Sequence, residues 1–110
     1  MKVLLVDDEA LARRRLRQML GEYADSEIAG ECESADEAVE RIRELSPDLV
    51  FLDVQMPGRN GFEVIAALEP EERPLTIFVT AYDEYALNAF EVHAVDYLLK
   101  PFDRNRFRAA

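Results

Sequence analysis

The sequence has few of the features that mark a secreted or membrane-spanning chain. A single cysteine, Cys32, excludes an internal disulfide. No apolar run approaches the roughly 20 residues that span a bilayer, and the opening stretch MKVLLVDDE turns acidic too soon for a signal peptide. We therefore expect a cytoplasmic chain that does not bind membranes, in which Cys32 is a small core residue rather than a nucleophile.

Positive charge is also scarce. The chain has 13 Lys and Arg against 23 Asp and Glu, which gives a formal net charge of −10. Because phosphate backbones are bound by clustered Lys and Arg, we do not expect this chain alone to bind nucleic acid. The one dense basic run is Arg13-Arg14-Arg15 with Arg17. We interpret it as the solvated face of a helix, with a partner surface as the alternative.

Short apolar runs alternate with amphipathic helical patterns along the whole chain. Buried strands are expected at residues 3–6, 26–32, 49–52, 76–79 and 95–99. The first helical pattern has an apolar face made of Leu11, Leu16, Met19 and Leu20. The second helix is predicted to start at the capping box Ser34-Ala35-Asp36-Glu37.

Strands that alternate with helices predict an α/β fold with a parallel sheet and helices on both faces. The 110 residues are enough for one domain, residues 1–110. The strand at 26–32 is the least apolar and is expected at an edge of the sheet. Only about two turns of helix follow the fifth strand, so the last helix is predicted to be short or truncated.

Polar residues stand at the carboxyl ends of four expected strands. Asp7 and Asp8 follow the first strand, Asp53 the third, Thr80 the fourth and Lys100 the fifth. In a parallel sheet these ends share one edge, which is where open α/β sheets bind ligands. Each residue alone has an ordinary explanation, such as a helix cap for the Asp pair or a turn for Asp53. Their coincidence at one edge favours a functional site.

The residue types indicate phosphoryl chemistry. Three neighbouring carboxylates repel one another, and a divalent cation removes that conflict. Oxygen ligands without His or Cys favour Mg²⁺ over zinc. A carboxylate such as that of Asp53 can form an aspartyl phosphate. Lys100 and the Thr80 hydroxyl could contact the phosphoryl oxygens, so we hypothesise phosphoryl transfer onto Asp53.

Four stretches, VLLVDDE, LDVQMPGRNGFEV, FVTAY and DYLLKPF, make the chain similar to the receiver domain of two-component response regulators over its full length. The region FVTAYDEYALNAFEVHAVDYLLKPF resembles receivers joined to LytTR-type (LytR/AlgR-like) DNA-binding domains. The resemblance implies a flavodoxin-like, doubly wound sheet of five parallel strands in the order 2-1-3-4-5.

The resemblance also implies roles for the candidate residues. Asp53 would be the phosphoacceptor. Asp8 and Asp53 would bind Mg²⁺ with the backbone carbonyl of Gln55, and Asp7 would act partly through water.

Thr80 and Lys100 would contact the phosphoryl group, and Lys100-Pro101 would be a cis peptide. Phosphorylation adds about −1.5 to −2 charges. Thr80 would turn toward this charge and Tyr97, the switch aromatic, would rotate inward. The face formed by helix 4, strand 5 and helix 5 would then change shape and form a homodimer.

We therefore expect a switch phosphorylated by a sensor histidine kinase that regulates a DNA-binding transcriptional output, rather than an enzyme. One alternative is a Mg²⁺-dependent phosphohydrolase that turns over an aspartyl phosphate. Haloacid-dehalogenase-like phosphatases have a second Asp two positions after the nucleophile, where this chain has Gln55. A flavodoxin-like binding module is the other alternative, which the lack of a Gly-rich phosphate loop disfavours.

Overall fold

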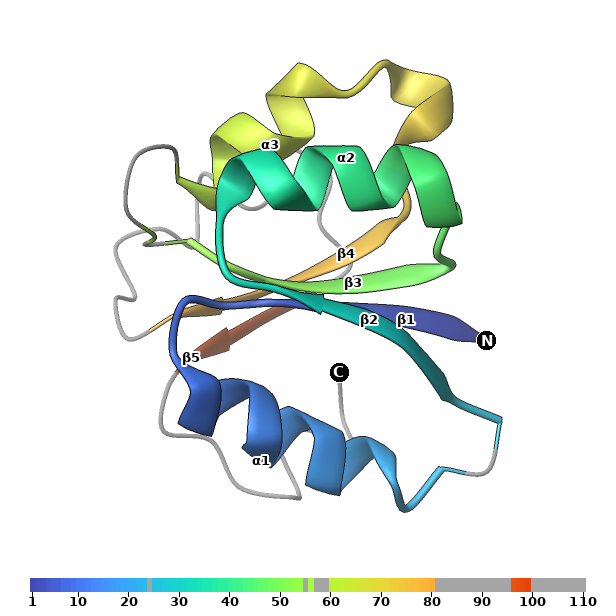
Figure 1. Cartoon of the computed structure of the whole chain (residues 1–110), viewed down its shortest axis with the longest axis vertical. Helices are drawn as coiled ribbons and strands as arrows, with labels where there is room; N and C mark the ends of the chain where they lie inside the picture. Colours follow the sequence, from blue (N-terminus) through green and yellow to red (C-terminus); the bar gives the residue numbers. More distant parts are fainter. Residues whose placement is uncertain (24, 55, 57–59, 81–95, 100–110) are drawn as a thin grey trace.

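The computed structural model describes residues 1–23, 25–54, 56, 60–80 and 96–99 (Figure 1). Its strands are β1 (Lys2–Val6), β2 (Glu27–Cys32), β3 (Leu49–Asp53), β4 (Leu75–Thr80) and β5 (Asp96–Leu99). They form one sheet in the order β2-β1-β3-β4-β5, and every neighbouring pair is parallel. The predicted α/β fold and strand order are confirmed, and β2 is an edge strand as expected.

Helices cover both faces of the sheet, as predicted. Helix α1 (Ala10–Leu20) lies on one face, and α2 (Ala35–Leu45) and α3 (Gly61–Ala67) lie on the other (Figure 1). A short 3₁₀ helix, η1 (Pro70–Glu72), leads into β4. No helix among the described residues is long and apolar enough to cross a membrane. Helix 4, which the resemblance implies between β4 and β5, and the predicted short last helix lie outside the described residues.

The sheet separates two apolar cores because side chains alternate along each strand. Val3 and Leu5 of β1 pack on the α1 side, whereas Leu4 and Val6 pack on the α2 and α3 side. All four are at most 1% exposed, which explains the continuous apolar run in this strand. Cys32 is fully buried in the core on the α2 and α3 side, where desolvation raises the pKa of its thiol to about 12. Its interpretation as a core residue is confirmed.

The start of α2 is capped largely as predicted. Ser34 Oγ accepts a hydrogen bond from the Glu37 N–H at 3.3 Å. The Glu37 carboxylate accepts from the N–H of Glu33 at 2.9 Å, one residue earlier than in a standard capping box. Both bonds satisfy backbone donors at the start of α2 and just before it, and they also fix the segment that connects β2 to this helix.

One expectation about α1 is wrong, and one alternative for the aspartates is excluded. Leu11 is 71% exposed, whereas Leu16, Met19 and Leu20 are buried. Since successive helical residues are about 100° apart, Leu11 lies about 140° around the helix from Leu16 and faces away from the sheet. The residue before the helix is Glu9, with no side-chain cap bond, so neither preceding aspartate is the helix cap.

Candidate acidic site

Four carboxylates meet at the carboxyl ends of β1 and β3. Asp7, Asp8 and Glu9 follow β1 directly, and Asp53 is the last residue of β3. One carboxylate oxygen from each residue lies within 4.8 Å of the others. The two strands are neighbours with Val6 opposite Leu52, so the next residue of each strand comes to the same place. The structure thus brings together the three aspartates selected from the sequence. We call these four residues the acidic cluster.

The acidic cluster has a buried and an exposed half. Asp7 is 1% exposed and Asp53 is 4% exposed, whereas Asp8 and Glu9 are exposed to solvent. Ionised carboxylates at buried positions cost free energy unless donors or cations accompany them. One such donor is the Glu9 N–H, which bonds to Asp7 Oδ1 at 2.9 Å. Glu9 was not predicted as a member, and its only sequence signal is its position directly after Asp8.

The end of β3 is held against the start of α3 by a close backbone approach. The N–H of Gly61 donates to the carbonyl of Val54 at 2.8 Å. A Cβ on Gly61 would lie 2.5 Å from the main-chain oxygen of Asp53. Only a residue without a side chain allows this contact, which seats the helix directly beside the buried aspartate.

The helix that begins at Gly61 has its own cap. Asn60 Oδ1 accepts from the Glu63 N–H at 3.0 Å, and the Glu63 carboxylate accepts from the Asn60 N–H at 3.0 Å. This reciprocal capping box, N-G-F-E, fixes where α3 starts and therefore where Gly61 meets β3. The sequence analysis did not identify Gly61 as a packing residue, although the Asn-x-x-Glu spacing was a usable signal.

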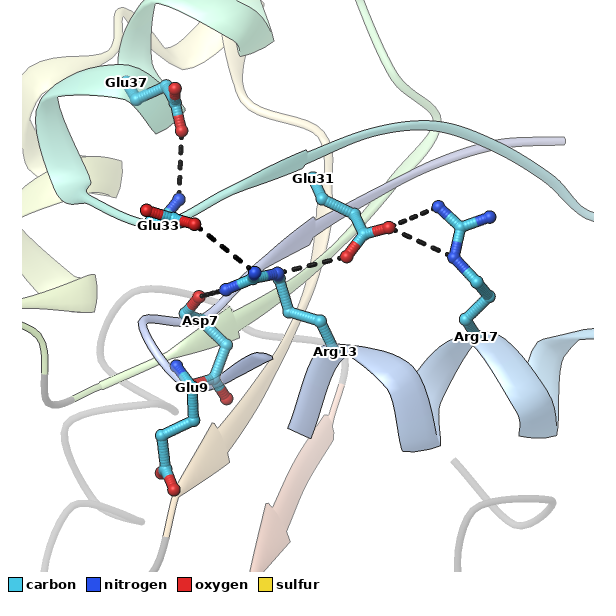
Figure 2. Close-up of polar contacts among 7 residues, drawn as sticks. All are labelled: Asp7, Glu9, Arg13, Arg17, Glu31, Glu33 and Glu37. Carbon is cyan, nitrogen blue, oxygen red and sulfur yellow. Dashed lines mark hydrogen bonds and ion pairs between the residues drawn. The ribbon is translucent and has the colours of Figure 1, made fainter. Parts of the chain in front are cut away.

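An arginine from α1 reaches the main chain of the acidic cluster (Figure 2). Arg13 Nη1 donates to the Asp7 carbonyl at 2.6 Å, and its Nε donates to Glu31 Oε1 at 3.0 Å. The Arg13 side chain is only 12% exposed, whereas that of Arg17 is 53% exposed. The interpretation of the basic run as a solvated helix face is therefore wrong for Arg13, because Glu31 of the edge strand β2 and the Asp7 carbonyl after β1 bind its guanidinium group.

Glu31 lies between two arginines. Arg17 pairs with its second carboxylate oxygen, and Arg13 binds the first. Hydrogen bonding from Arg17, aided by the charge of Arg17 and by Arg13, lowers the pKa of Glu31 below its ordinary value of 4.5 despite partial desolvation. The ionised form is thus stabilised in the folded chain.

This lowered pKa predicts a specific pH dependence. In the folded state Glu31 has the lower pKa, so its stabilising contribution is complete above about pH 4.5 and declines as the pH falls through the lowered value. We expect the difference in unfolding free energy between wild type and Glu31→Gln to be at most about 1 kcal/mol at pH 7, because the pair is partly exposed. Urea unfolding of both proteins from pH 7 to pH 3 measures this. A difference that is constant or grows toward low pH would contradict the assignment.

Of the remaining predicted site residues, the structure places the backbones of Thr80 and Tyr97. Asp53 is opposite Val79 in β4, so the next residue, Thr80, ends β4 at the same edge of the sheet. The backbone of Thr80 pairs with Leu99, and Tyr97 of β5 pairs with Phe78. Three predicted site residues lie outside the described residues: Gln55, Lys100 and Pro101.

Comparison with known proteins gives consistent matches. The family model for the response regulator receiver domain matches residues 3–110. The transcriptional regulatory protein BtsR of Escherichia coli K12 is 55% identical over 105 residues, which cover 96% of this chain and 44% of the relative. The chain therefore spans less than half the length of this relative.

Solved structures agree with the sequence match. The response regulatory domain of mrkE from Klebsiella pneumoniae superposes with a TM-score of 0.87 at 32% identity, over 97% of this chain and 88% of the other. The receiver domain of AraT from Geobacillus stearothermophilus gives a TM-score of 0.84 at 35% identity, over 98% and 87%. Sequence and fold thus point to the same family over nearly the whole chain.

Proposed function

Because this chain belongs to the response regulator receiver domain family, we propose that it is a signalling switch that accepts a phosphoryl group on Asp53. The observation that carries the proposal is the placement of Asp53, a 4%-exposed carboxylate at the end of β3 within the acidic cluster. Receiver domains of response regulators are phosphorylated by histidine kinases, so the proposed donor is a sensor histidine kinase.

The acidic cluster fits a magnesium ion. It offers carboxylate oxygens from Asp7, Asp8 and Asp53 within 4.8 Å of one another, and Mg²⁺ prefers oxygen ligands. We propose that these three residues hold the ion together with the backbone carbonyl of Gln55. When bound, Mg²⁺ would neutralise negative charge on the carboxylates and on the phosphoryl oxygens. The exposed Asp8 leaves the cluster accessible to ion and donor.

The strand ends support further contacts to the phosphoryl group. Thr80 follows the residue paired with Asp53 and is the proposed hydroxyl donor. Lys100 is the proposed cation, and a cis Lys100-Pro101 bond is part of the same proposal. Tyr97, whose backbone pairs with Phe78 of β4, is the proposed switch residue that responds to Thr80. The changed face of helix 4, β5 and helix 5 would then form a homodimer.

The relatives suggest what the switch controls. BtsR is a transcriptional regulatory protein more than twice as long as this chain. We propose that phosphorylation regulates a LytTR-type DNA-binding output that this chain does not include, and that the chain itself does not bind nucleic acid or membranes. The cytoplasm is the proposed compartment.

Acetyl phosphate tests the proposal without knowledge of the kinase. We expect the chain to gain one phosphoryl group by intact-mass analysis with MgCl₂, and none with EDTA. Phosphate release measured in parallel should not exceed slow decay of the labelled chain. Absence of labelling in MgCl₂ would contradict the switch. Rapid multiple turnover without accumulation of the phosphorylated chain would indicate a phosphohydrolase.

A further inference from the structure

Arg13 uses all three guanidinium nitrogens on three partner residues from two segments of the chain. Nη1 donates to the Asp7 carbonyl at 2.6 Å, Nε to Glu31 at 3.0 Å, and Nη2 approaches Glu33 Oε1 at 3.5 Å (Figure 2). Arginine suits this role because its planar fork presents fixed donors in several directions. The side chain thus links α1 to the end of β2 and to the loop that carries the acidic cluster.

The main chain of Asp7 is held from both sides. Its N–H donates to the Cys32 carbonyl at 3.0 Å, and its carbonyl accepts from Arg13. Its side chain accepts from the N–H of Glu9. The position of the first carboxylate after β1 therefore depends on Arg13 as well as on the sheet.

The partners of Arg13 are themselves anchored. Glu31 is held in β2 by strand pairing opposite Leu5 of β1, and the Glu33 N–H donates to the Glu37 carboxylate in the first turn of α2 (Figure 2). Because both ends of the link are fixed, Arg13 transmits the position of β2 and α2 to Asp7.

The negative charge of the acidic cluster increases the importance of the bond from Arg13 to the Asp7 carbonyl. The acidic cluster places four carboxylates close together in a chain of net charge −10, and like charges at this spacing repel. A charged donor on the Asp7 carbonyl opposes the spreading of the loop and forms a stronger bond than a neutral donor would.

We propose that Arg13 is a positioning residue that fixes the acidic cluster in the arrangement that holds a divalent cation. The inference rests on the proposed function, since it assumes that the cluster binds Mg²⁺. Arg13 itself does not touch the metal. It acts through the main chain of Asp7, as partners behind metal ligands commonly do.

Arg17 provides a matched control. It lies one turn further along α1, carries the same charge and binds the same Glu31, but its bonds go to Glu31 and none of those described goes to Asp7. Isothermal titration of the metal-free chain with MgCl₂ compares wild type, Arg13→Gln and Arg17→Gln. We expect the Mg²⁺ dissociation constant to rise about tenfold in Arg13→Gln. In Arg17→Gln it should stay within about twofold of wild type, as for an exposed pair.

Thermal unfolding in metal-free buffer separates positioning from folding. Both variants lose a bond to Glu31, so a purely structural role would lower the metal-free melting temperature of Arg13→Gln while leaving its Mg²⁺ affinity equal to that of Arg17→Gln. That result would overturn the inference. If Arg13→Gln does not fold, Arg13→Lys keeps the charge without the three-way fork. We expect it to bind Mg²⁺ more weakly than wild type, and unchanged affinity would overturn the inference.

The wild-type titration distinguishes the two proposals. Absence of Mg²⁺ binding by wild type would overturn the proposed metal site and this inference with it. Binding and acetyl phosphate labelling by wild type, with equal affinities for the two glutamine variants, would overturn the inference alone.

Discussion

Replacement of Asp53 by asparagine is expected to abolish labelling of the chain by acetyl phosphate. Asparagine keeps nearly the same shape at this 4%-exposed position but has no carboxylate to form an acyl phosphate. Intact-mass analysis in MgCl₂ should show the phosphorylated species for wild type and only the unmodified chain for the variant. Persistent labelling of Asp53→Asn would remove Asp53 as the phosphoacceptor.

The same variant should also change how the chain responds to metal. It removes one charge from a cluster of four carboxylates, so crowding of negative charge decreases and the metal-free stability should rise by on the order of 1 kcal/mol. Stabilisation by MgCl₂ should shrink because a ligand is lost. Asp25→Asn makes the identical chemical change at an exposed residue that offers its main-chain carbonyl to the amino group of Met1. Asp25→Asn should be phosphorylated by acetyl phosphate to the same extent as wild type, and its free energy of unfolding should change by less than about 0.5 kcal/mol.

Replacement of Gly61 by alanine is expected to destabilise the fold, because among the described glycines a Cβ at Gly61 would make the shortest contact. The new Cβ would lie 2.5 Å from the main-chain oxygen of Asp53 and 3.2 Å from its carbonyl carbon. The atoms that the new Cβ would meet belong to the backbone of Asp53 and cannot rotate away as a side chain could. Either the start of α3 or the end of β3 must therefore move. Overpacking of this kind costs about 1–3 kcal/mol. Urea unfolding should report this loss, and acetyl phosphate labelling should slow because Asp53 shifts with the strand.

Gly30 in β2 is the control for this experiment. A Cβ there would lie 3.4 Å from Leu4 Cδ1 and 3.6 Å from Leu45 Cδ1, which are ordinary contact distances to side chains. Gly30→Ala should therefore alter stability by less than about 1 kcal/mol in either direction, since alanine also restricts the unfolded chain. Equal stabilities and labelling rates for the two alanine variants would show that the Gly61 contact is relieved without moving Asp53.

The acidic cluster shows how far sequence reasoning reaches. Asp7, Asp8 and Asp53 could be grouped in advance because each follows an apolar run, and parallel strands end at a common edge. Glu9 was not grouped with them, since its participation depends on how the chain turns between β1 and α1. The tight contact at Gly61 was also missed, because it joins two segments whose separation no local pattern measures.

The basic run on α1 shows a second limit of sequence reasoning, because one of its residues was predicted to be solvated and is instead largely buried. No feature of the sequence distinguishes the four arginines of this run, Arg13, Arg14, Arg15 and Arg17. A solvated helix face was therefore the reasonable prediction for all of them. Arg13 differs because Glu31 and the loop after β1 lie within its reach once α1 packs on the sheet. Leu11 was misplaced for a related reason, since an apolar residue in the first turn need not face the core.

The sequence by itself determined the succession of strands and helices, the position of β2 at an edge of the sheet, and the edge at which the aspartates meet. The succession follows from hydrophobic periodicity, which is a local pattern. The common edge follows from the rule that parallel strands all end on the same side of a sheet. Only the tertiary structure decided that Asp53 is buried against Gly61, that Glu9 joins the acidic cluster, and that Arg13 holds Asp7. Those contacts depend on distances of a few ångströms between separately folded segments, which packing sets and no local pattern encodes.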